Sequence, residues 1–232
     1  MEEDLTQDEL LNLLKNPSSE EEIKQSAIEI EWQNAQKYER NWWVYYTGNH
    51  PVEIHKNNIE ARFMMVDHGL PGKSVLDIGC GPLSLLQRIK VGTATALDPC
   101  HYGDLEKVYE KNGIRRLYKR GEDLSEADGT FDEAWIYNCL QHVLNPTQIL
   151  ENAMKVASIV RIFEWIHIDP YEGHLHKLTP ELLRGPFMKE GSGWSVLYET
   201  TGKFFIGENE QYYVAIFKRN ELKITSIDLY NM

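Results

Sequence analysis

The residues from Asp77 to Gly81 combine a carboxylate with two glycines at a spacing suited to ligand binding. Val75 and Leu76 form an apolar run before them, and Pro82 and a helix-like apolar pattern follow. This order predicts a buried strand, a glycine turn and the start of a helix. Glycine has no Cβ, so the turn can adopt positive φ and a ligand can approach the main chain. The Asp77 carboxylate would then bind a ligand's ammonium group or orient the turn.

Asp98 is a second acidic residue, and it ends the next predicted strand. A carboxylate about 20 positions after a glycine turn is placed to accept hydrogen bonds from ribose hydroxyls. A dinucleotide fingerprint, G-x-G-x-x-G, would share this feature, but no third glycine follows Gly79 and Gly81 in place. A carboxylate at Asp77 would also repel a pyrophosphate. A cofactor with an ammonium and a sulfonium group suits the turn better.

Alternating strand-like and helix-like segments must position these residues. The strand-like runs lie near residues 74–78, 93–98, 115–118, 132–137 and 158–166, and the helix-like segments near 83–90, 102–112 and 146–156. Such alternation predicts βαβ units, a parallel sheet with helices on both faces, and strand ends gathered along one edge. The last third differs, because W-S-V-L-Y-E-T, K-F-F-I-G and Q-Y-Y-V-A-I-F-K predict antiparallel strands that close the sheet.

The N-terminal part is expected to be helical. Residues 5–15, 19–46 and 55–68 have apolar side chains at helical spacing, and Pro17 with Ser18 separates the first two segments. We therefore divide the chain into an N-terminal helical extension or lid, residues 1–69, and a main domain, residues 70–232.

Composition and charge limit the classes of function. The formal net charge of −12 repels phosphate backbones, so nucleic acid is a poor candidate substrate. No apolar run approaches the roughly 20 residues that span a bilayer, and the acidic N-terminus lacks the features of a secretory signal. The three cysteines form no metal-ligand or disulfide spacing. A reducing, cytoplasmic setting without a membrane partner is the simplest interpretation.

Two further motifs complete a resemblance to a known family. R-G-E-D-L spans residues 120–124, and a strand beginning F-D runs from Phe131 into a loop that ends at Pro146. Together with D-I-G-C-G-P from Asp77 and the acidic Asp98, they resemble the class I S-adenosylmethionine-dependent methyltransferases. The resemblance covers roughly residues 70–218.

The resemblance implies a fold, a cofactor and a set of cofactor contacts. The fold would be α/β: a Rossmann-like three-layer sandwich with a mostly parallel seven-stranded sheet, antiparallel C-terminal strands and an N-terminal helical extension. The cofactor would be S-adenosylmethionine. Its contacts would come from Asp77, Gly79, Gly81, Asp98, Gly121, Glu122, Asp123, Asn138 and Leu140. Two positions depart from the family pattern: Leu83 stands where many members have a third glycine, and Arg120-Gly121 leads the adenine-side motif.

A histidine-rich tract follows the fifth predicted strand, where the family places its substrate loop. His167 and Asp169 are two apart and would share a face of the strand; His174 and His176 are paired in the same way. His167, His142 or His174 would act as a general base, with Asp169 beside it, or bind substrate. Alternatively, the tract binds a metal, or it consists of polar loop residues. His-x-His without a third ligand is a weak metal signal, so no metal is assigned.

The aromatic cluster at the end of the second predicted helix has two interpretations. Trp42, Trp43, Tyr45 and Tyr46 would pack the extension on the sheet, or line a lid over the active-site edge. In the second case Trp42 and Tyr46, with His174 and His176, would bind substrate, and aromatic faces would attract the sulfonium.

These observations favour a methyltransferase that acts on an oxygen or nitrogen atom of a small molecule. A homodimer is a candidate assembly, and no nucleic-acid partner is expected. Two alternatives stay open: a non-catalytic cofactor-binding or regulatory module with this fold, and a methyltransferase that acts on protein or nucleic acid.

Overall fold

The computed structural model describes residues 20–49, 70–203 and 211–220. These residues contain a seven-stranded sheet with strand order β3-β2-β1-β4-β5-β7-β6. Its strands are β1 (Ser74–Ile78), β2 (Thr93–Leu97), β3 (Arg115–Leu117), β4 (Phe131–Tyr137), β5 (Ala157–Ile166), β6 (Trp194–Lys203) and β7 (Gln211–Arg219). Strands β1 to β5 pair in parallel, whereas β7 is antiparallel to both β5 and β6. The predicted fold class is confirmed.

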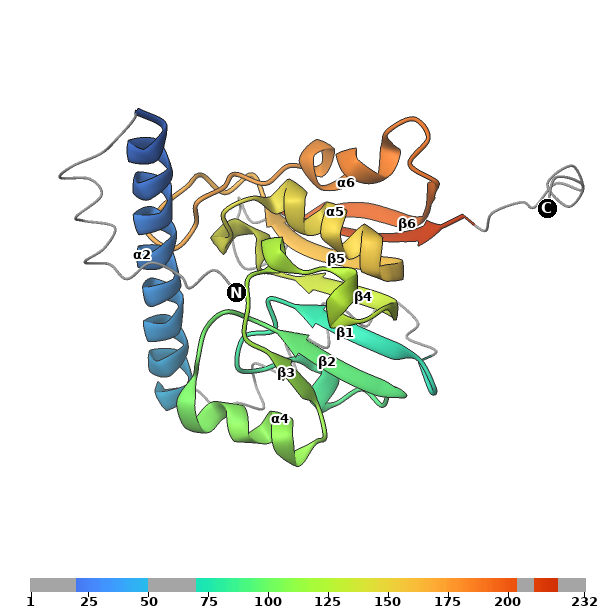
Figure 1. Cartoon of the computed structure of the whole chain (residues 1–232), viewed down its shortest axis with the longest axis horizontal. Helices are drawn as coiled ribbons and strands as arrows, with labels where there is room; N and C mark the ends of the chain where they lie inside the picture. The colour runs from blue at the N-terminus through green and yellow to red at the C-terminus, as the bar shows by residue number, and fades with distance from the viewer. Residues whose placement is uncertain (1–19, 50–69, 204–210, 221–232) are drawn as a thin grey trace, which may run out of the picture.

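The helices flank the sheet, and one of them lies across the carboxyl ends of its parallel strands (Figure 1). They are α2 (Glu20–Asn49), α4 (Lys107–Lys111), α5 (Pro146–Val156) and α6 (Pro180–Met188), with short 3-10 turns η1 (Leu85–Gln87), η2 (Gly103–Glu106), η3 (Gly121–Asp123), η4 (Glu126–Asp128) and η5 (Leu140–His142). Figure 1 shows α2, in blue, standing across the side to which the arrowheads of the parallel strands point. The ends of β1, β2, β4 and β5 therefore open toward α2.

The strands carry apolar side chains toward both faces because successive residues alternate. Leu76 and Ile78 of β1 belong to the core cluster that contains residues of α5 and α6. Val75, the residue before Leu76, belongs to the second cluster, on the other face, with Leu85 and Tyr109. A sheet covered on both faces is typical of α/β folds, and it leaves the strand ends as the place for a ligand.

Most predicted elements are confirmed, and two helices are shorter than expected. Residues 146–156 form α5, with the Asn145 side chain capping its start, and Thr179 caps α6 with Pro180 in its first turn. The expected helix over 83–90 is wrong: only η1 forms, because the Ser84 hydroxyl accepts the N–H of Leu86 and so holds a tight turn. Residues 102–112 divide into η2 and α4.

Several expectations concern residues outside the described part of the chain. The helices predicted over 5–15 and 55–68 lie there, as does most of K-F-F-I-G. The helix predicted over 19–46 is confirmed as α2, which extends to Asn49. The boundary between residues 69 and 70 stays a prediction.

Candidate active site

The glycine loop after β1 adopts the conformation that its residues predicted. Gly79 and Gly81 have φ of +70° and +54°. The N–H groups of Gly79 and Cys80 donate to the carbonyl of Leu97 at 2.8 and 3.1 Å, which fixes the loop to the end of β2. A Cβ at Gly79 would overlap the Cys139 side chain. Glycine is therefore required at this position by both backbone conformation and space.

The carboxylates of Asp77 and Asp98 hold the loops after β1 and β2 through hydrogen bonds. Asp77 is buried and accepts the Ser84 hydroxyl, so it orients the loop. Asp98 accepts the N–H of Gly81 at 2.9 Å through Oδ2 and that of Cys100 at 2.8 Å through Oδ1. Burial raises the pKa of Asp77 to about 7, and burial also raises the pKa of Asp98. Of the two roles considered for Asp77, the structure shows the orienting one.

The loop at 120–123 forms a second wall of the site. Asn152 of α5 donates to the carbonyls of Gly121 and Glu122 at 3.2 and 2.6 Å. A Cβ at Gly121 would lie 2.8 Å from Cδ1 of Ile149, so a larger residue would displace the loop from α5. The Glu122 carboxylate accepts the N–H of Asn145 at 2.9 Å. Contacts from α5 therefore hold this loop.

The loop after β4 is held by a buried carboxyl group. Asn138 has φ of +57°, and the N–H groups of Cys139 and Leu140 both donate to Oε1 of Glu164 at 3.0 Å. Glu164 is fully buried on β5, and burial raises its pKa to about 8. The neutral carboxyl group therefore prevails near neutral pH and positions the loop that carries Asn138.

Helix α2 closes the site along one helical face. Trp32, Gln36, Glu39 and Trp43 follow one another at intervals of four, three and four residues, which places them on the same side of the helix. Arg120 stacks on the Trp32 ring with its Cζ 4.0 Å from the centroid. Its guanidinium also donates to both oxygens of Glu29 at 2.6 and 2.9 Å.

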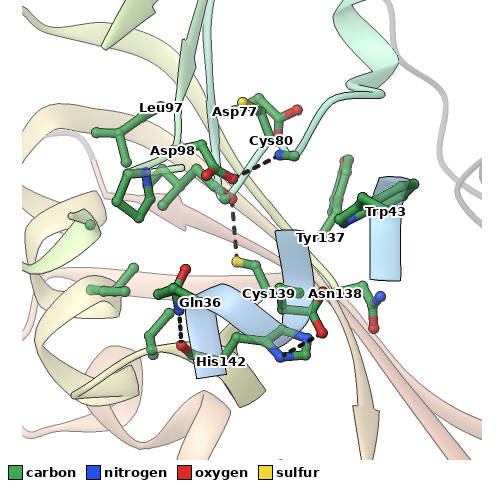
Figure 2. A pocket seen from close by; sticks show the side chains of 18 of the residues that line it. Gln36, Trp43, Asp77, Cys80, Leu97, Asp98, Tyr137, Asn138, Cys139 and His142 are labelled. Atoms are coloured by element: carbon green, nitrogen blue, oxygen red, sulfur yellow. Dashed lines mark hydrogen bonds and ion pairs between the residues drawn. The ribbon is translucent and has the colours of Figure 1, made fainter. Parts of the chain in front are cut away.

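Further along α2, the polar side chain of Gln36 contacts the loops after β4 and β2. Nε2 of Gln36 donates to the His142 carbonyl at 2.6 Å (Figure 2). Oε1 of Gln36 lies 3.4 Å from Sγ of Cys100. The Trp43 ring lies 3.7 Å from the position of a Cβ on Gly81, so it packs on the glycine loop. The helix thus spans the site from the 120–123 loop to the glycine loop.

A cavity of about 500 Å³ lies between α2 and the strand ends. Eleven of the sixteen predicted site residues line this cavity. Those that do are Trp42, Tyr46, Asp77, Gly79, Gly81, Asp98, Gly121, Glu122, Asn138, His142 and His174. Leu140 instead packs in the core, and Asp123 and His176 also lie outside the lining. Sequence reasoning missed Gln36 and Glu39, although their helical spacing with Trp32 and Trp43 was readable.

His142 is a neutral side chain in this cavity. Its Nδ1 lies 2.7 Å from the Gly173 carbonyl oxygen. A carbonyl only accepts hydrogen bonds, so Nδ1 carries the hydrogen and Nε2 is left as an acceptor. Burial, followed by the nearby His174, lowers the pKa of His142 to about 4.

The histidine-rich tract leaves the strand earlier than expected. Strand β5 ends at Ile166, and His167 has φ of +63° and is exposed, as is Asp169, which pairs with Lys177 at 2.7 Å. The expectation that His167 and Asp169 share a strand face is therefore wrong. Neither residue lines the cavity.

The other two histidines of the tract have different surroundings. Nε2 of His174 lies 3.2 Å from the Tyr171 hydroxyl, and Nε2 of His176 lies 2.7 Å from the Val143 carbonyl oxygen. In the described residues, no three His, Cys, Asp or Glu side chains come together as a metal site. None of the described helices is long and apolar enough to cross a membrane.

Comparison with known proteins finds similarity to a methyltransferase domain over part of the chain. A family model of the methyltransferase domain matches residues 76–158, from β1 to the start of β5. An uncharacterized protein of Methanocaldococcus jannaschii is 30% identical over 105 residues, which cover 44% of this chain and 46% of that protein. The match thus spans less than half the length of that relative.

Solved structures share the fold at low sequence identity. The 1,6-didemethyltoxoflavin-N1-methyltransferase of Burkholderia thailandensis, solved with its namesake ligand and S-adenosylhomocysteine, has a TM-score of 0.54 and 16% identity, over 85% of this chain and 90% of that one. The cyclase SpnF has a TM-score of 0.55 and 13% identity, over 71% of this chain and 79% of that one.

Family model and fold together confirm the resemblance to the class I S-adenosylmethionine-dependent methyltransferases. They indicate S-adenosylmethionine as the cofactor. A cyclase with the same fold shows that the fold alone does not decide the reaction.

Proposed function

We propose that this chain is an enzyme that transfers the methyl group of S-adenosylmethionine to an oxygen or nitrogen atom of a small molecule. The observation that carries the proposal is the cavity of about 500 Å³ between the strand ends and α2. Sites for small ligands commonly have volumes of about 300–1,000 Å³. The cavity is lined on one side by the glycine loop and Asp98, and on the other by the loops after β4 and β5.

The residues on the donor side of the cavity fit the cofactor. Each oxygen of Asp98 accepts one backbone N–H, and Oδ1 also accepts the Tyr102 hydroxyl at 3.4 Å. A carboxylate has about four acceptor positions, so one remains for a ribose hydroxyl, and a second hydroxyl can replace the long contact with Tyr102. The absence of a Cβ at Gly79 and Gly81 leaves the loop backbone open to a ligand. We assign Gly121 and Glu122 to the adenine end and Asn138 to the methionine end.

Methyl transfer requires the protein to position the acceptor atom against the methyl group, and it requires no covalent intermediate with the protein. When bound, S-adenosylmethionine supplies a methyl group already activated by its sulfonium. The chain must place the acceptor, exclude water and accept a proton where the acceptor has to lose one. Helix α2 covers the cavity, and His142 offers a neutral nitrogen as a hydrogen-bond acceptor. His167 and Asp169 receive no role in this proposal because they are exposed outside the cavity.

Calorimetric titration with S-adenosylmethionine and S-adenosylhomocysteine tests the donor site. Asp98→Asn should weaken both affinities at least tenfold. The amide N–H₂ of asparagine would face a backbone N–H donor, and the ligand would lose hydrogen bonds to a charged acceptor, which contribute about 1.5–3 kcal/mol. Asp104→Asn is the matched control, since the Asp104 side chain is 91% exposed and pairs with Lys107 outside the cavity. If the folded wild-type chain binds neither compound, the proposal is wrong.

A tritiated-methyl assay separates transfer from mere binding. Separate reactions would contain metabolite pools, total RNA and total protein, with and without chelator. Label is expected in the metabolite pool, because the net charge of −12 disfavours a polyanionic acceptor. Binding without label in any pool would favour a regulatory module, and label in RNA or protein would contradict the small-molecule assignment. A cytoplasmic setting belongs to the proposal and agrees with the free, buried Cys80, Cys100 and Cys139.

A further inference from the structure

The charged side chains that line the cavity are mostly acidic. Among the described residues, they are Glu39, Asp77, Asp98, Glu122 and Arg120. The one cation, Arg120, is held by both oxygens of Glu29 and by the Trp32 ring. An anionic acceptor would therefore meet no available counter-charge from these residues.

Glu39 differs from the other three acids in how its carboxylate is satisfied. Asp77 accepts the Ser84 hydroxyl, and Asp98 and Glu122 accept backbone N–H groups. In the described part of the chain, the Glu39 carboxylate has a polar contact with Nδ1 of His142, which lies 3.4 Å from its Oε1. That N–H is directed to the Gly173 carbonyl at 2.7 Å, so it serves Glu39 weakly.

The Glu39 side chain is nevertheless largely removed from water. It is 17% exposed, and the Gly173 backbone packs against it, since a Cβ there would lie 3.1 Å from Oε1 of Glu39. Burial, followed by the nearby Asp98, raises the pKa of Glu39 to about 7. A largely buried carboxylate with one weak contact gains from a ligand that brings a positive charge.

Its position along α2 places Glu39 between the two ends of the donor site. Trp32 contacts Arg120 beside the proposed adenine loop, and Trp43 lies on the glycine loop. Glu39 lies between them on the same helical face and contacts the loops after β4 and β5 through His142 and Gly173. These two loops form the acceptor side of the proposed function.

Aromatic side chains line the same cavity as this carboxylate. Trp42 and Tyr46 are stacked with centroids 4.8 Å apart, and Trp43 meets Trp42 edge-on at 4.9 Å. Further aromatic lining residues come from the strand ends and the loop after β5: Tyr137, Trp165 and Tyr171. Aromatic faces attract cations, most strongly where water is excluded. A carboxylate among such rings is the usual composition of a site for an organic ammonium ion.

We infer that the acceptor is a small organic amine, bound as its ammonium ion by Glu39 among these aromatic rings, and that Glu39 takes its proton before methyl transfer. This inference rests on the proposed function and narrows its acceptor atom to nitrogen. His142 is a positioning residue, because its ring lies against the carboxylate of Glu39.

The step balances without a further reactant. The ammonium gives one proton to the Glu39 carboxylate, and the freed nitrogen lone pair forms a bond to the methyl carbon. The carbon–sulfur bond breaks, and its electron pair goes to the sulfonium sulfur. The products are S-adenosylhomocysteine and an N-methylated ammonium ion, and Glu39 releases its proton to solvent.

The charge of the labelled product tests the inference without a guess at the substrate. Product from the tritiated metabolite pool is first separated from unreacted S-adenosylmethionine, which is itself a cation, and is then applied to cation- and anion-exchange resins at pH 7. The label should be retained by the cation exchanger and should resist mild base that cleaves methyl esters. Label in the flow-through or on the anion exchanger would overturn the amine assignment.

Variants of α2 test the role of Glu39 separately. Glu39→Gln keeps the shape of the side chain but removes the charge and the proton acceptor, and it should reduce kcat/KM for the retained product at least tenfold. Its affinity for S-adenosylhomocysteine should stay within twofold of wild type. Glu31→Gln, on the exposed side of α2, should change neither quantity.

A second measurement needs no turnover. With S-adenosylhomocysteine bound, phenethylamine and other arylalkylamines are titrated against their alcohol analogues. The amines should bind more tightly to wild type, and Glu39→Gln should abolish the difference. If S-adenosylhomocysteine binds but amines and alcohols bind alike, the inference fails while the proposed function stands. If S-adenosylhomocysteine itself does not bind, the proposed function fails first.

Discussion

Replacing Glu164 with glutamine tests whether the carboxyl group beneath the loop after β4 is protonated in the folded protein. Oε1 accepts the N–H groups of Cys139 and Leu140, and Oε2 is buried with no hydrogen-bond partner among the described residues. Burial is the largest cause that raises its pKa from 4.5 to about 8. Glutamine has nearly the same shape and offers a carbonyl oxygen to the same two N–H groups, but it does not titrate.

The expected magnitude follows from proton linkage. Between pH 4.5 and about pH 8, the folded chain keeps a proton on Glu164 that the unfolded chain releases. The free energy of unfolding therefore falls as pH rises, by about 1.4 kcal/mol per pH unit. From pH 5.5 to 7.5 this group alone should cost wild type about 3 kcal/mol, and Glu164→Gln should not show this loss. Other buried carboxyls, such as Asp77, are present in both chains and cancel in the comparison.

Urea unfolding followed by circular dichroism at pH 5.5 and 7.5 measures this difference. Glu110→Gln, which changes an exposed carboxylate on α4, serves as the control and should follow wild type. The reasoning is refuted if wild type and Glu164→Gln change in stability by the same amount between the two pH values. It is also refuted if the variant loses more stability than wild type as the pH rises.

Two other predictions concern the walls of the cavity. Gly79→Ala should lower the free energy of unfolding by about 3 kcal/mol or more and abolish cofactor binding, because its Cβ would overlap the Cys139 side chain at a positive φ. Gly113→Ala is the control: its φ is +67° but its Cβ would meet open space, so it should cost only about 1 kcal/mol. Thermal unfolding measures both. Arg120→Ala should free the start of α2 and speed its cleavage in limited proteolysis several-fold, because it loses about 1–2 kcal/mol of paired contacts. Lys119 pairs with Asp128 of η4 instead, so Lys119→Ala should leave the cleavage of α2 unchanged. Equal cleavage of the two variants would argue against a stabilising contact between Arg120 and α2.

The donor side of the site was predictable because its signals are local. Positive φ at Gly79 and Gly81 depends on the missing Cβ of each glycine, and the position of Asp98 depends on the length of one βα unit. The start of α5 was likewise readable, since Pro146 follows a capping Asn145. Such features involve residues close in sequence, so residue type and spacing suffice.

The acceptor side could not be predicted in the same way. The sequence suggested His167 as a base on a strand face, but β5 ends one residue earlier, where the chain turns toward Leu178. The side chains that do meet come from distant segments: Gln36 and His142 are 106 residues apart in sequence. Glu39 was not singled out, because a glutamate on a helix is usually a solvated residue.

The sequence by itself determined the α/β fold, the glycine loop and the acidic residue at the end of β2, because hydrophobic periodicity, capping and glycine conformation are set by near neighbours along the chain. Only the tertiary structure decided which face of α2 covers the strand ends. That packing buries the Glu39 carboxylate against His142 and Gly173 and leaves His167 in solvent. The physical reason is that burial and charge environment depend on contacts between distant segments, which residue spacing does not encode.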